Sequence, residues 1–122
     1  MSDARMAYVL MDTVDPGQLA PFWSELLGVG VAATVGDGDF VVLEPGGEGM
    51  PALAFQKVPE AKVGKNRMHL DLIVEDLEAA TQQITELGGV WLDGETREVE
   101  GYRWRCMADP QGNEFDIVPA DN

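Results

Sequence analysis

The chain has 122 residues, enough for one ordinary domain with a real core but too few for two independent ones. Hydrophobic residues make up 45% and charged residues 25%, values typical of globular proteins, which argues against wholesale disorder. The formal net charge of −14, from 22 acidic and 8 basic residues, repels phosphate backbones and anionic lipid, so we expect neither nucleic acid nor a membrane surface as a partner.

Cysteine usage and the N-terminal sequence together indicate a compartment. Cys106 is the only cysteine, so an internal disulfide is excluded, as is usual for a reducing environment. The N-terminal sequence MSDARMAYVL has no long apolar region, and no run approaches the ~20 apolar residues of a membrane span. We therefore expect a cytoplasmic protein.

The first half opens with a short apolar strand over residues 6–11, in which Tyr8 and Leu10 share one face. Asp15-Pro16 is typical of a helix N-cap followed by the first helical residue, and Gly28 marks the end of this helix. Its apolar stripe recurs at helical spacing: Leu19, Phe22, Trp23, Leu26 and Leu27. The stripe predicts packing on a sheet, with Trp23 in the core.

Three further strands complete the first half. Val29–Thr34 and Phe40–Leu43 flank Gly36-Asp37-Gly38, in which Asp-Gly is a strong hairpin signal. A glycine-rich loop over Pro45–Pro51 then leads into the strand Ala52–Val58. The first half is predicted to be β–α–β–β–β.

The second half repeats this order. In the sequence RMHLDLIVEDLEAA, residues 68–74 alternate like a strand. This places His69 and Asp71 on the face that points away from the following helix. Asp76 is the expected helix cap, and Gly88-Gly89 ends the helix. The remaining strands are predicted at Val90–Arg97, Tyr102–Ala108 and Asn113–Val118, with a tight turn at residues 109–112 before the last one.

The two halves match each other in register. Asp15 corresponds to Asp76, and ELLG at 25–28 corresponds to ELGG at 86–89, both at an offset of 61 residues. The same offset aligns Tyr8 with His69. Val58-Pro59 corresponds to Val118-Pro119 at an offset of 60 residues, which places Gln56 on Asp116. These matches predict an internal duplication.

Three segments in this order and spacing resemble one family: FWSELLG, HLDLIVEDLEAA and ADPQGNEFDIV. They resemble the glyoxalase-like, bleomycin-resistance-type and dioxygenase domains of the vicinal oxygen chelate superfamily, over essentially the whole chain. The resemblance implies an α+β fold, a single domain over residues 1–122 made of two repeats, 5–59 and 66–119. The two βαβββ modules, at about 6–58 and 67–119, are expected to form a curled, cup-shaped mixed sheet with the helices outside and a ligand inside. Because members of the superfamily catalyse different reactions or only bind drugs, the resemblance leaves open whether this chain is an enzyme.

The resemblance also implies four metal-ligand positions, one on the first strand and one on the last strand of each module: Tyr8, Gln56, His69 and Asp116. Strand alternation adds Asp71 and Glu114 to the same concave face. The metal enzymes of the family usually present His, Gln or Glu at these positions, whereas this chain has the neutral phenol of Tyr8 and the shorter carboxylate of Asp116. We therefore expect no tightly bound metal; if a divalent ion binds, its ligands are His69, Asp116 and Gln56.

Several residues have two interpretations each. His69 is either a ligand contact, acting as a general acid/base or hydrogen-bond donor, or an interior residue satisfied by Asp71 or Asp116. Either Trp91 or Trp104 lines a pocket while the other is core. Arg103 and Arg105 are interpreted as solvated strand-edge charges rather than an anion site, and Cys106 as a small core residue.

The leading hypothesis is a metal-free domain that binds a small organic molecule through Tyr8, Gln56, His69, Asp71 and Asp116. The alternative is a metal-dependent lyase, isomerase or dioxygenase of the same superfamily, and a third is a sequestering module that serves a partner protein. A homodimer, with or without exchange of modules between chains, is expected from the resemblance. The sequence does not identify the ligand.

Overall fold

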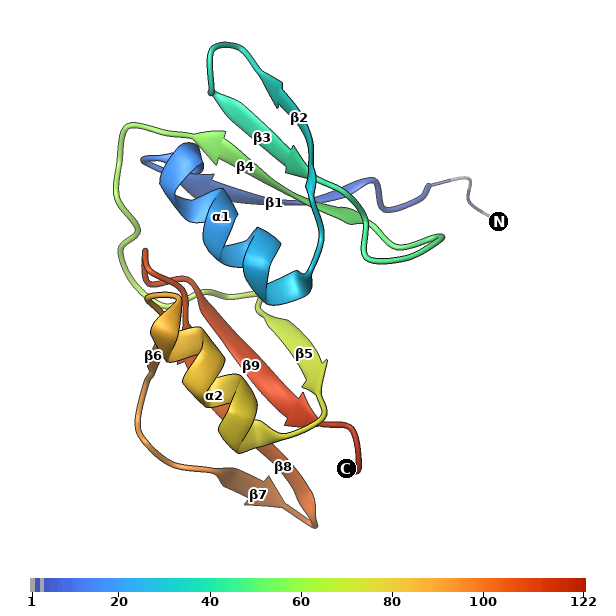
Figure 1. The fold of residues 1–122 in the computed structure, drawn as a ribbon, viewed down its shortest axis with the longest axis vertical. Helices are drawn as coiled ribbons and strands as arrows, with labels where there is room; N and C mark the ends of the chain where they lie inside the picture. The colour runs from blue at the N-terminus through green and yellow to red at the C-terminus, as the bar shows by residue number, and fades with distance from the viewer. Residues whose placement is uncertain (1, 3) are drawn as a thin grey trace. The chain divides into compact units, whose positions relative to one another are not determined.

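The computed structural model describes residue 2 and residues 4–122 of the chain. In these residues the fold is α+β, with two helices and nine strands in two mixed sheets (Figure 1). The chain divides into two compact units, Met1–Ala61 and Lys62–Asn122, and the boundary falls between the two predicted repeats. No helix among the described residues is long and apolar enough to cross a membrane.

The first unit has the predicted β–α–β–β–β order. Its elements are β1 (Tyr8–Thr13), α1 (Pro16–Leu27), β2 (Val31–Val35), β3 (Phe40–Leu43) and β4 (Ala52–Lys57). The sheet order is β1-β4-β3-β2, in which β1 and β4 are parallel neighbours and the other pairs are antiparallel. The β2–β3 hairpin turns at Gly36, Asp37 and Gly38, all with positive φ, as the Asp-Gly signal predicts.

Helix α1 forms where the local sequence predicts it and packs on this sheet. The Asp15 carboxylate accepts a hydrogen bond from the Gln18 backbone N–H at 3.2 Å, and Gly28 ends the helix in the left-handed conformation. Leu19 and Trp23 are fully buried, and the rings of Phe22 and Trp23 meet edge to face with their centroids 5.3 Å apart. The prediction that Trp23 is a core residue is confirmed.

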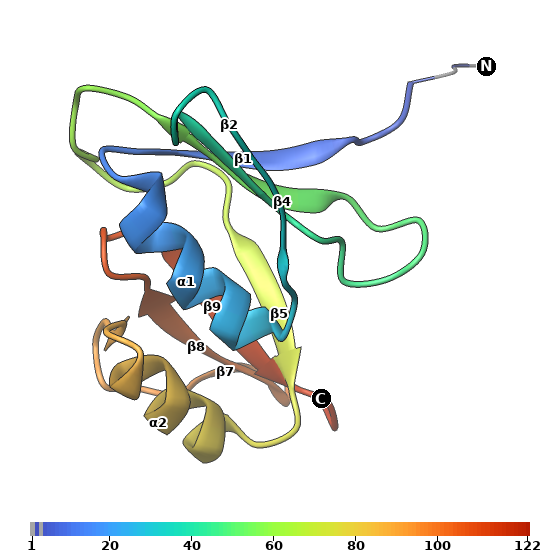
Figure 2. The same ribbon diagram turned by 45° about the horizontal axis from the view of Figure 1, so that its top comes forward.

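The second unit begins in the same way but has one more strand. Its elements are β5 (Leu70–Val74), α2 (Leu77–Glu86), β6 (Val90–Trp91), β7 (Arg97–Val99), β8 (Tyr102–Ala108) and β9 (Glu114–Pro119) (Figures 1 and 2). The sheet order is β5-β9-β8-β6, with β7 also paired to β8. The prediction of a single strand at Val90–Arg97 is wrong. The chain turns at Gly94, with φ of 69°, and the Asp93 carboxylate accepts a hydrogen bond from the Glu95 backbone N–H at 3.0 Å.

The backbone hydrogen bonds correct one part of the internal repeat. The Val58 N–H bonds the Thr13 carbonyl at 2.9 Å, and the Ala120 N–H bonds the Val74 carbonyl at 2.8 Å. Thr13 and Val74 differ by the predicted 61 residues, but Val58 and Ala120 differ by 62 (120 − 58) rather than the predicted 60. Asp116 therefore corresponds to Ala54, and the predicted correspondence of Asp116 with Gln56 is wrong.

Helix α2 covers one face of its sheet, so the other face can be assigned by alternation. Met107, Phe115 and Ile117 are at most 1% exposed, and Arg105 reaches α2 from the same face. The intervening residues of β8 and β9, and those paired with them on β5, point away from α2. We call this side the helix-free face; it carries Asp71, Ile73, Trp104, Cys106 and Asp116.

Candidate functional site

Three titratable side chains converge on the helix-free face of the second unit. The His69 Nε2 atom lies 3.3 Å from Asp71 Oδ1 and 3.2 Å from Asp116 Oδ2. Asp71 and Asp116 are cross-strand partners in the parallel pair β5–β9, which is why they are adjacent. About half of the His69 and Asp71 side chains is exposed, whereas Asp116 is more enclosed at 17%. We call these three residues the His69 cluster; it is accessible to a bound molecule and joins groups that hold and exchange protons.

The donor set of the His69 cluster fits a divalent ion. One ligand atom from each of the three residues lies within 4.8 Å of the other two. Metal–ligand bonds of ~2.1 Å place neighbouring ligand atoms roughly 3.0–3.4 Å apart, which matches both His69–carboxylate distances. A charge-assisted N–H···O bond is shorter, about 2.7–2.9 Å, and one Nε2 proton is shared poorly between two carboxylates. An imidazole and two carboxylates with open positions would suit zinc, manganese or iron(II).

The first unit offers no comparable donor set at the equivalent positions. By the corrected register, Leu10 and Ala54 stand where the second unit has Asp71 and Asp116, and they are partners in β1–β4. Tyr8, the equivalent of His69, is opposite Ala52, whereas Gln56 is opposite Asp12, four positions further along the same sheet. Tyr8 and Gln56 are therefore on one face but at opposite ends of the strand pair, roughly 13 Å apart along the strand. That they meet the His69 cluster stays a prediction.

Burial and the neighbouring Asp116 both disfavour the charged form of Asp71 in the cluster. Burial raises the pKa of Asp71 above its ordinary value, and the neighbouring Asp116 raises it further, while His69 opposes the rise. The native state therefore holds the Asp71 proton to higher pH than the unfolded chain does. Stability from this group is present at low pH and is lost as the pH rises from the unfolded pKa through the folded one.

We expect Asp71→Asn to raise the melting temperature at neutral pH, because the uncharged amide removes the repulsion with Asp116. The advantage over the unsubstituted protein should shrink below the ordinary aspartate pKa, where the native carboxyl is already neutral. Thermal unfolding followed by circular dichroism between pH 3 and pH 8 measures this difference. The matched control is Glu98→Gln, on an exposed position of β7; a similar pH dependence in both variants would contradict the assignment.

Cys106 extends the cluster to the next strand. It is the antiparallel partner of Asp116, is partly exposed, and is not the core residue that the sequence predicted. Burial raises the pKa of the Cys106 thiol, the Asp116 carboxylate raises it further, and Arg97 of β7 counteracts part of the rise. The thiol is thus a neutral hydrogen-bonding neighbour of Asp116 rather than a nucleophile. Its position two residues from Trp104 is the sequence signal that places both side chains on one face of the strand.

The structure distinguishes the two candidate tryptophans. Trp91 lies beneath the guanidinium of Arg105, whose Cζ is 4.0 Å from the ring centroid, and its Nε1–H bonds the Glu95 carbonyl. Trp104 is two residues from Cys106 on the helix-free face, is partly exposed, and has Tyr102 as a ring neighbour at 6.1 Å. Trp104 is therefore the tryptophan available to a ligand near the His69 cluster.

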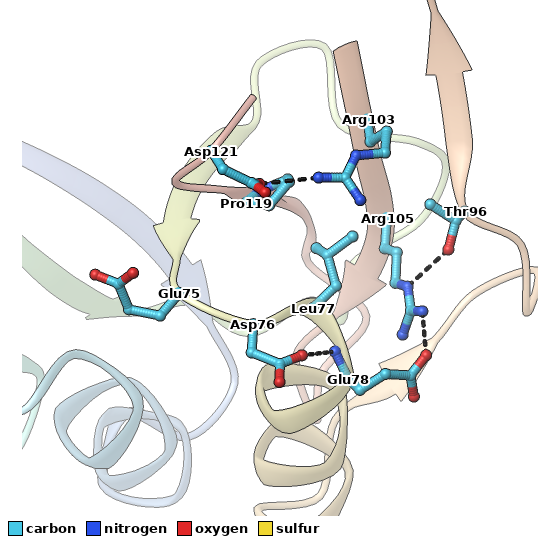
Figure 3. Close-up of a pocket in the computed structure, with 9 residues that line it drawn as sticks. All are labelled: Glu75, Asp76, Leu77, Glu78, Thr96, Arg103, Arg105, Pro119 and Asp121. Carbon is cyan, nitrogen blue, oxygen red and sulfur yellow. Dashed lines mark hydrogen bonds and ion pairs between the residues drawn. The ribbon is translucent and has the colours of Figure 1, made fainter. Parts of the chain in front are cut away.

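A separate cleft of about 400 Å³ opens beside the start of α2, on the other side of the sheet (Figure 3). Its walls include Arg103 and Arg105, whose interpretation as two solvated charges is wrong for Arg105. Arg105 is 5% exposed and bonds Thr81. Figure 3 shows its bonds to Thr96 and Glu78 and the bond of the partly exposed Arg103 to Asp121. Since both guanidinium groups are paired and the cleft also holds the carboxylates of Glu75 and Asp76, it is a poor anion site.

The fold and the cluster define a class: paired β–α–β units with an exposed histidine–carboxylate group on one sheet. The sequence model of the glyoxalase-like domain family matches residues 8–118. The chain therefore belongs to the glyoxalase-like domain family. No curated protein matches the chain.

Solved structures with glyoxalase-type names have the same fold. A glyoxalase/bleomycin resistance protein/dioxygenase family enzyme from Burkholderia phytofirmans is 16% identical with a TM-score of 0.78, covering 95% of this chain and 98% of that chain. A superfamily member from Sphaerobacter thermophilus is 21% identical with a TM-score of 0.70, covering 95% and 97%. The oxidase ChaP-H2 is also 21% identical with a TM-score of 0.70, covering 97% and 94%. At these identities the likeness establishes the fold and not the reaction.

Proposed function

We propose that this glyoxalase-like domain binds a small organic molecule on the helix-free face, without a tightly bound metal. The observation that carries the proposal is the convergence of His69, Asp71 and Asp116 at a partly exposed position. A small-molecule site typically combines a few convergent polar groups with apolar surface. The first unit adds no carboxylate or imidazole at the equivalent positions, which argues for weak metal affinity.

The surroundings of the cluster suggest the kind of molecule. Ile73, which is 77% exposed, and the partly exposed Trp104 present apolar surface on the same face. Two adjacent carboxylates with one imidazole favour a hydrogen-bond donor or a cation over an anion. We therefore propose a ligand with a flat apolar body that contacts Trp104 and with a hydroxyl or amino group that bonds the carboxylates.

Binding is tested by isothermal titration calorimetry with planar amines, phenols and carboxylic acids, and with metal-free bleomycin because several relatives carry that drug in their names. We expect amines or phenols to bind, and His69→Ala and Asp116→Asn each to weaken binding by about tenfold or more, because a charged hydrogen bond is lost. Glu86→Gln, at the end of α2, is the matched control. A preference for the carboxylic acids, or equal binding by all variants, would contradict the proposal.

The second candidate is a metal-dependent lyase, isomerase or dioxygenase. It is favoured by the match of the His69–carboxylate distances to the spacing of ligands around one ion, with Asp71 as the third ligand instead of the predicted Gln56. Bound there, an ion would supply Lewis acidity, while the chain's own residues would orient the substrate. Metal analysis of protein purified without chelator, before and after addition of zinc, nickel, manganese or iron(II), separates the candidates. Stoichiometric uptake that is lost in His69→Ala would replace the metal-free proposal with this one.

We also propose a homodimer, as the family resemblance leads us to expect. The support is the family membership of residues 8–118 alone. Size-exclusion chromatography with light scattering measures the mass directly, and a particle of the 13.2 kDa monomer would contradict the proposal.

A further inference from the structure

The segment that leads into His69 is held to the start of β9 through Glu114. The Asn66 backbone N–H donates to Glu114 Oε1 at 2.9 Å, and the Asn66 side-chain amide donates to the Glu114 carbonyl at 3.1 Å. Lys62 Nζ is 3.1 Å from the same Oε1 atom, and Lys65 Nζ is 3.7 Å from Oε2. One side chain therefore holds three residues of the 62–66 segment.

The bond from the Asn66 backbone N–H fixes the main chain of the segment, whereas the two lysine contacts hold flexible side chains. The same bond lowers the pKa of Glu114. The Glu114 side chain is 18% exposed, whereas Lys65 is 79% exposed, so the Lys65 ion pair contributes little. The carboxylate acts mainly as an acceptor that fixes the backbone at residue 66.

His69 needs such support because it lies outside the sheet. Strand β5 begins at Leu70, so the ladder to β9 starts one residue after the histidine. Residues 67 and 68 form a bend, and Met68 is 87% exposed, so neither packs the histidine in place. The backbone at His69 is thus fixed from two sides, by β5 after it and by the Asn66–Glu114 contacts three residues before it.

Among the described residues of the first unit, no side chain provides an equivalent of this anchor. The corrected register places Ala52 where the second unit has Glu114, and Ala52 is the strand partner of Tyr8. Alanine has no side-chain acceptor, and the contact that Ala52 makes with the preceding chain is a backbone one, from its N–H to the Ala7 carbonyl at 3.3 Å. The anchor is therefore confined to the unit that carries the histidine, as expected if its purpose is to orient His69.

We propose that Glu114 is a positioning residue, whose carboxylate holds the 62–66 segment so that His69 Nε2 stays against Asp71 and Asp116. The proposal rests on the function proposed above for the His69 cluster and adds a residue that does not touch the ligand. It predicts that loss of Glu114 separates the imidazole from its carboxylates while the sheet remains folded.

Nuclear magnetic resonance of the imidazole tests this directly, because His69 is the only histidine of the chain. In the unsubstituted protein at fixed pH, Asp116→Asn should move the ring ¹H and ¹⁵N signals, since the two groups are in contact. In the Glu114→Ala background we expect the movement caused by Asp116→Asn to fall by about half or more, as in a double-mutant cycle between coupled sites. A full-sized movement in folded Glu114→Ala would overturn the proposal.

Two further variants guard against a purely structural effect. Glu114→Gln keeps an oxygen acceptor for Asn66 and loses the charge, so its response should lie between those of the native residue and alanine. It also serves as the readout if Glu114→Ala fails to fold, and in that case a response as large as that of the unsubstituted protein would count against positioning. Glu98→Gln, exposed on β7, is the control and should leave the response unchanged.

The outcome is independent of the ligand titrations. If Glu114 positions His69 but the face binds none of the amines, phenols or acids, the imidazole response falls as predicted and only the proposed function is wrong. If the face binds a ligand through His69 and the imidazole response survives Glu114→Ala, the proposed function stands and the positioning role is wrong.

Discussion

Replacing Arg105 with alanine is expected to lower the free energy of unfolding by about 3 kcal/mol. The guanidinium donates from Nε to Thr96 Oγ1 at 2.9 Å and from Nη1 to Thr81 Oγ1 at 2.8 Å, and Nη2 pairs with Glu78. It also stacks on Trp91. Alanine would leave the hydroxyl of the buried Thr81 without this donor and a void over the indole, and both changes are costly in an enclosed position.

The matched control is Arg103→Ala, two residues away on the same strand. Arg103 bonds Asp121, whose side chain is 78% exposed, so we expect a loss below about 1 kcal/mol. Arg105→Lys should lie between the two, since a lysine keeps the charge but cannot reach three acceptors with a planar fork. Urea denaturation followed by circular dichroism compares the three variants. Equal losses at positions 103 and 105 would show that burial does not distinguish these arginines.

The helices and strand faces could be predicted because they depend on neighbouring residues. Asp15 and Asp76 both cap helices through their own carboxylates, as the sequence suggested from their position before an apolar stripe. Gly88, with φ of 100°, follows α2 as predicted. Each of these features is set within a few residues, which is the range that a sequence pattern reports.

The register between strands could not be predicted from residue identities. Val58-Pro59 and Val118-Pro119 look alike in sequence. The backbone hydrogen bonds nevertheless show that Val58 of the first unit is equivalent to Ala120 of the second. An error of two residues keeps every side chain on the same face, because the strand period is two. The alternation pattern therefore does not reveal such an error. It did change which residues are neighbours, and Gln56 was therefore predicted at the position that Ala54 occupies.

The same difference between local features and cross-strand contacts applies to the candidate site. His69 and Asp71 belong to one stretch of sequence, so their common face was correctly predicted, and Asp116 was added by the family resemblance. Cys106 was missed because its contact with Asp116 is a cross-strand one. Arg105 was misjudged because its burial depends on Thr81 of α2 and on Thr96, which belong to other elements than its own strand.

The largest loss of stability is expected for Trp23→Ala, at about 4 kcal/mol. Trp23 is 0% exposed and has the largest side chain among the fully buried residues of the first unit. Its ring meets Phe22 edge to face at an interplanar angle of 84°, and α1 contacts both β3 and β4. Removing the indole therefore deletes contacts to a neighbouring aromatic and leaves a large cavity under the helix.

A unit of this size has little spare core with which to fill such a cavity. Ile84 occupies the corresponding position of α2 and is also fully buried, but its side chain is much smaller, so Ile84→Ala should cost less than Trp23→Ala. Trp23→Phe keeps a ring and should lose roughly half as much as alanine does. Guanidinium denaturation followed by far-ultraviolet circular dichroism gives all three values without relying on tryptophan fluorescence. A cost for Trp23→Ala below that of Ile84→Ala would mean that the helix closes over the cavity, which the close packing of a small aromatic core argues against.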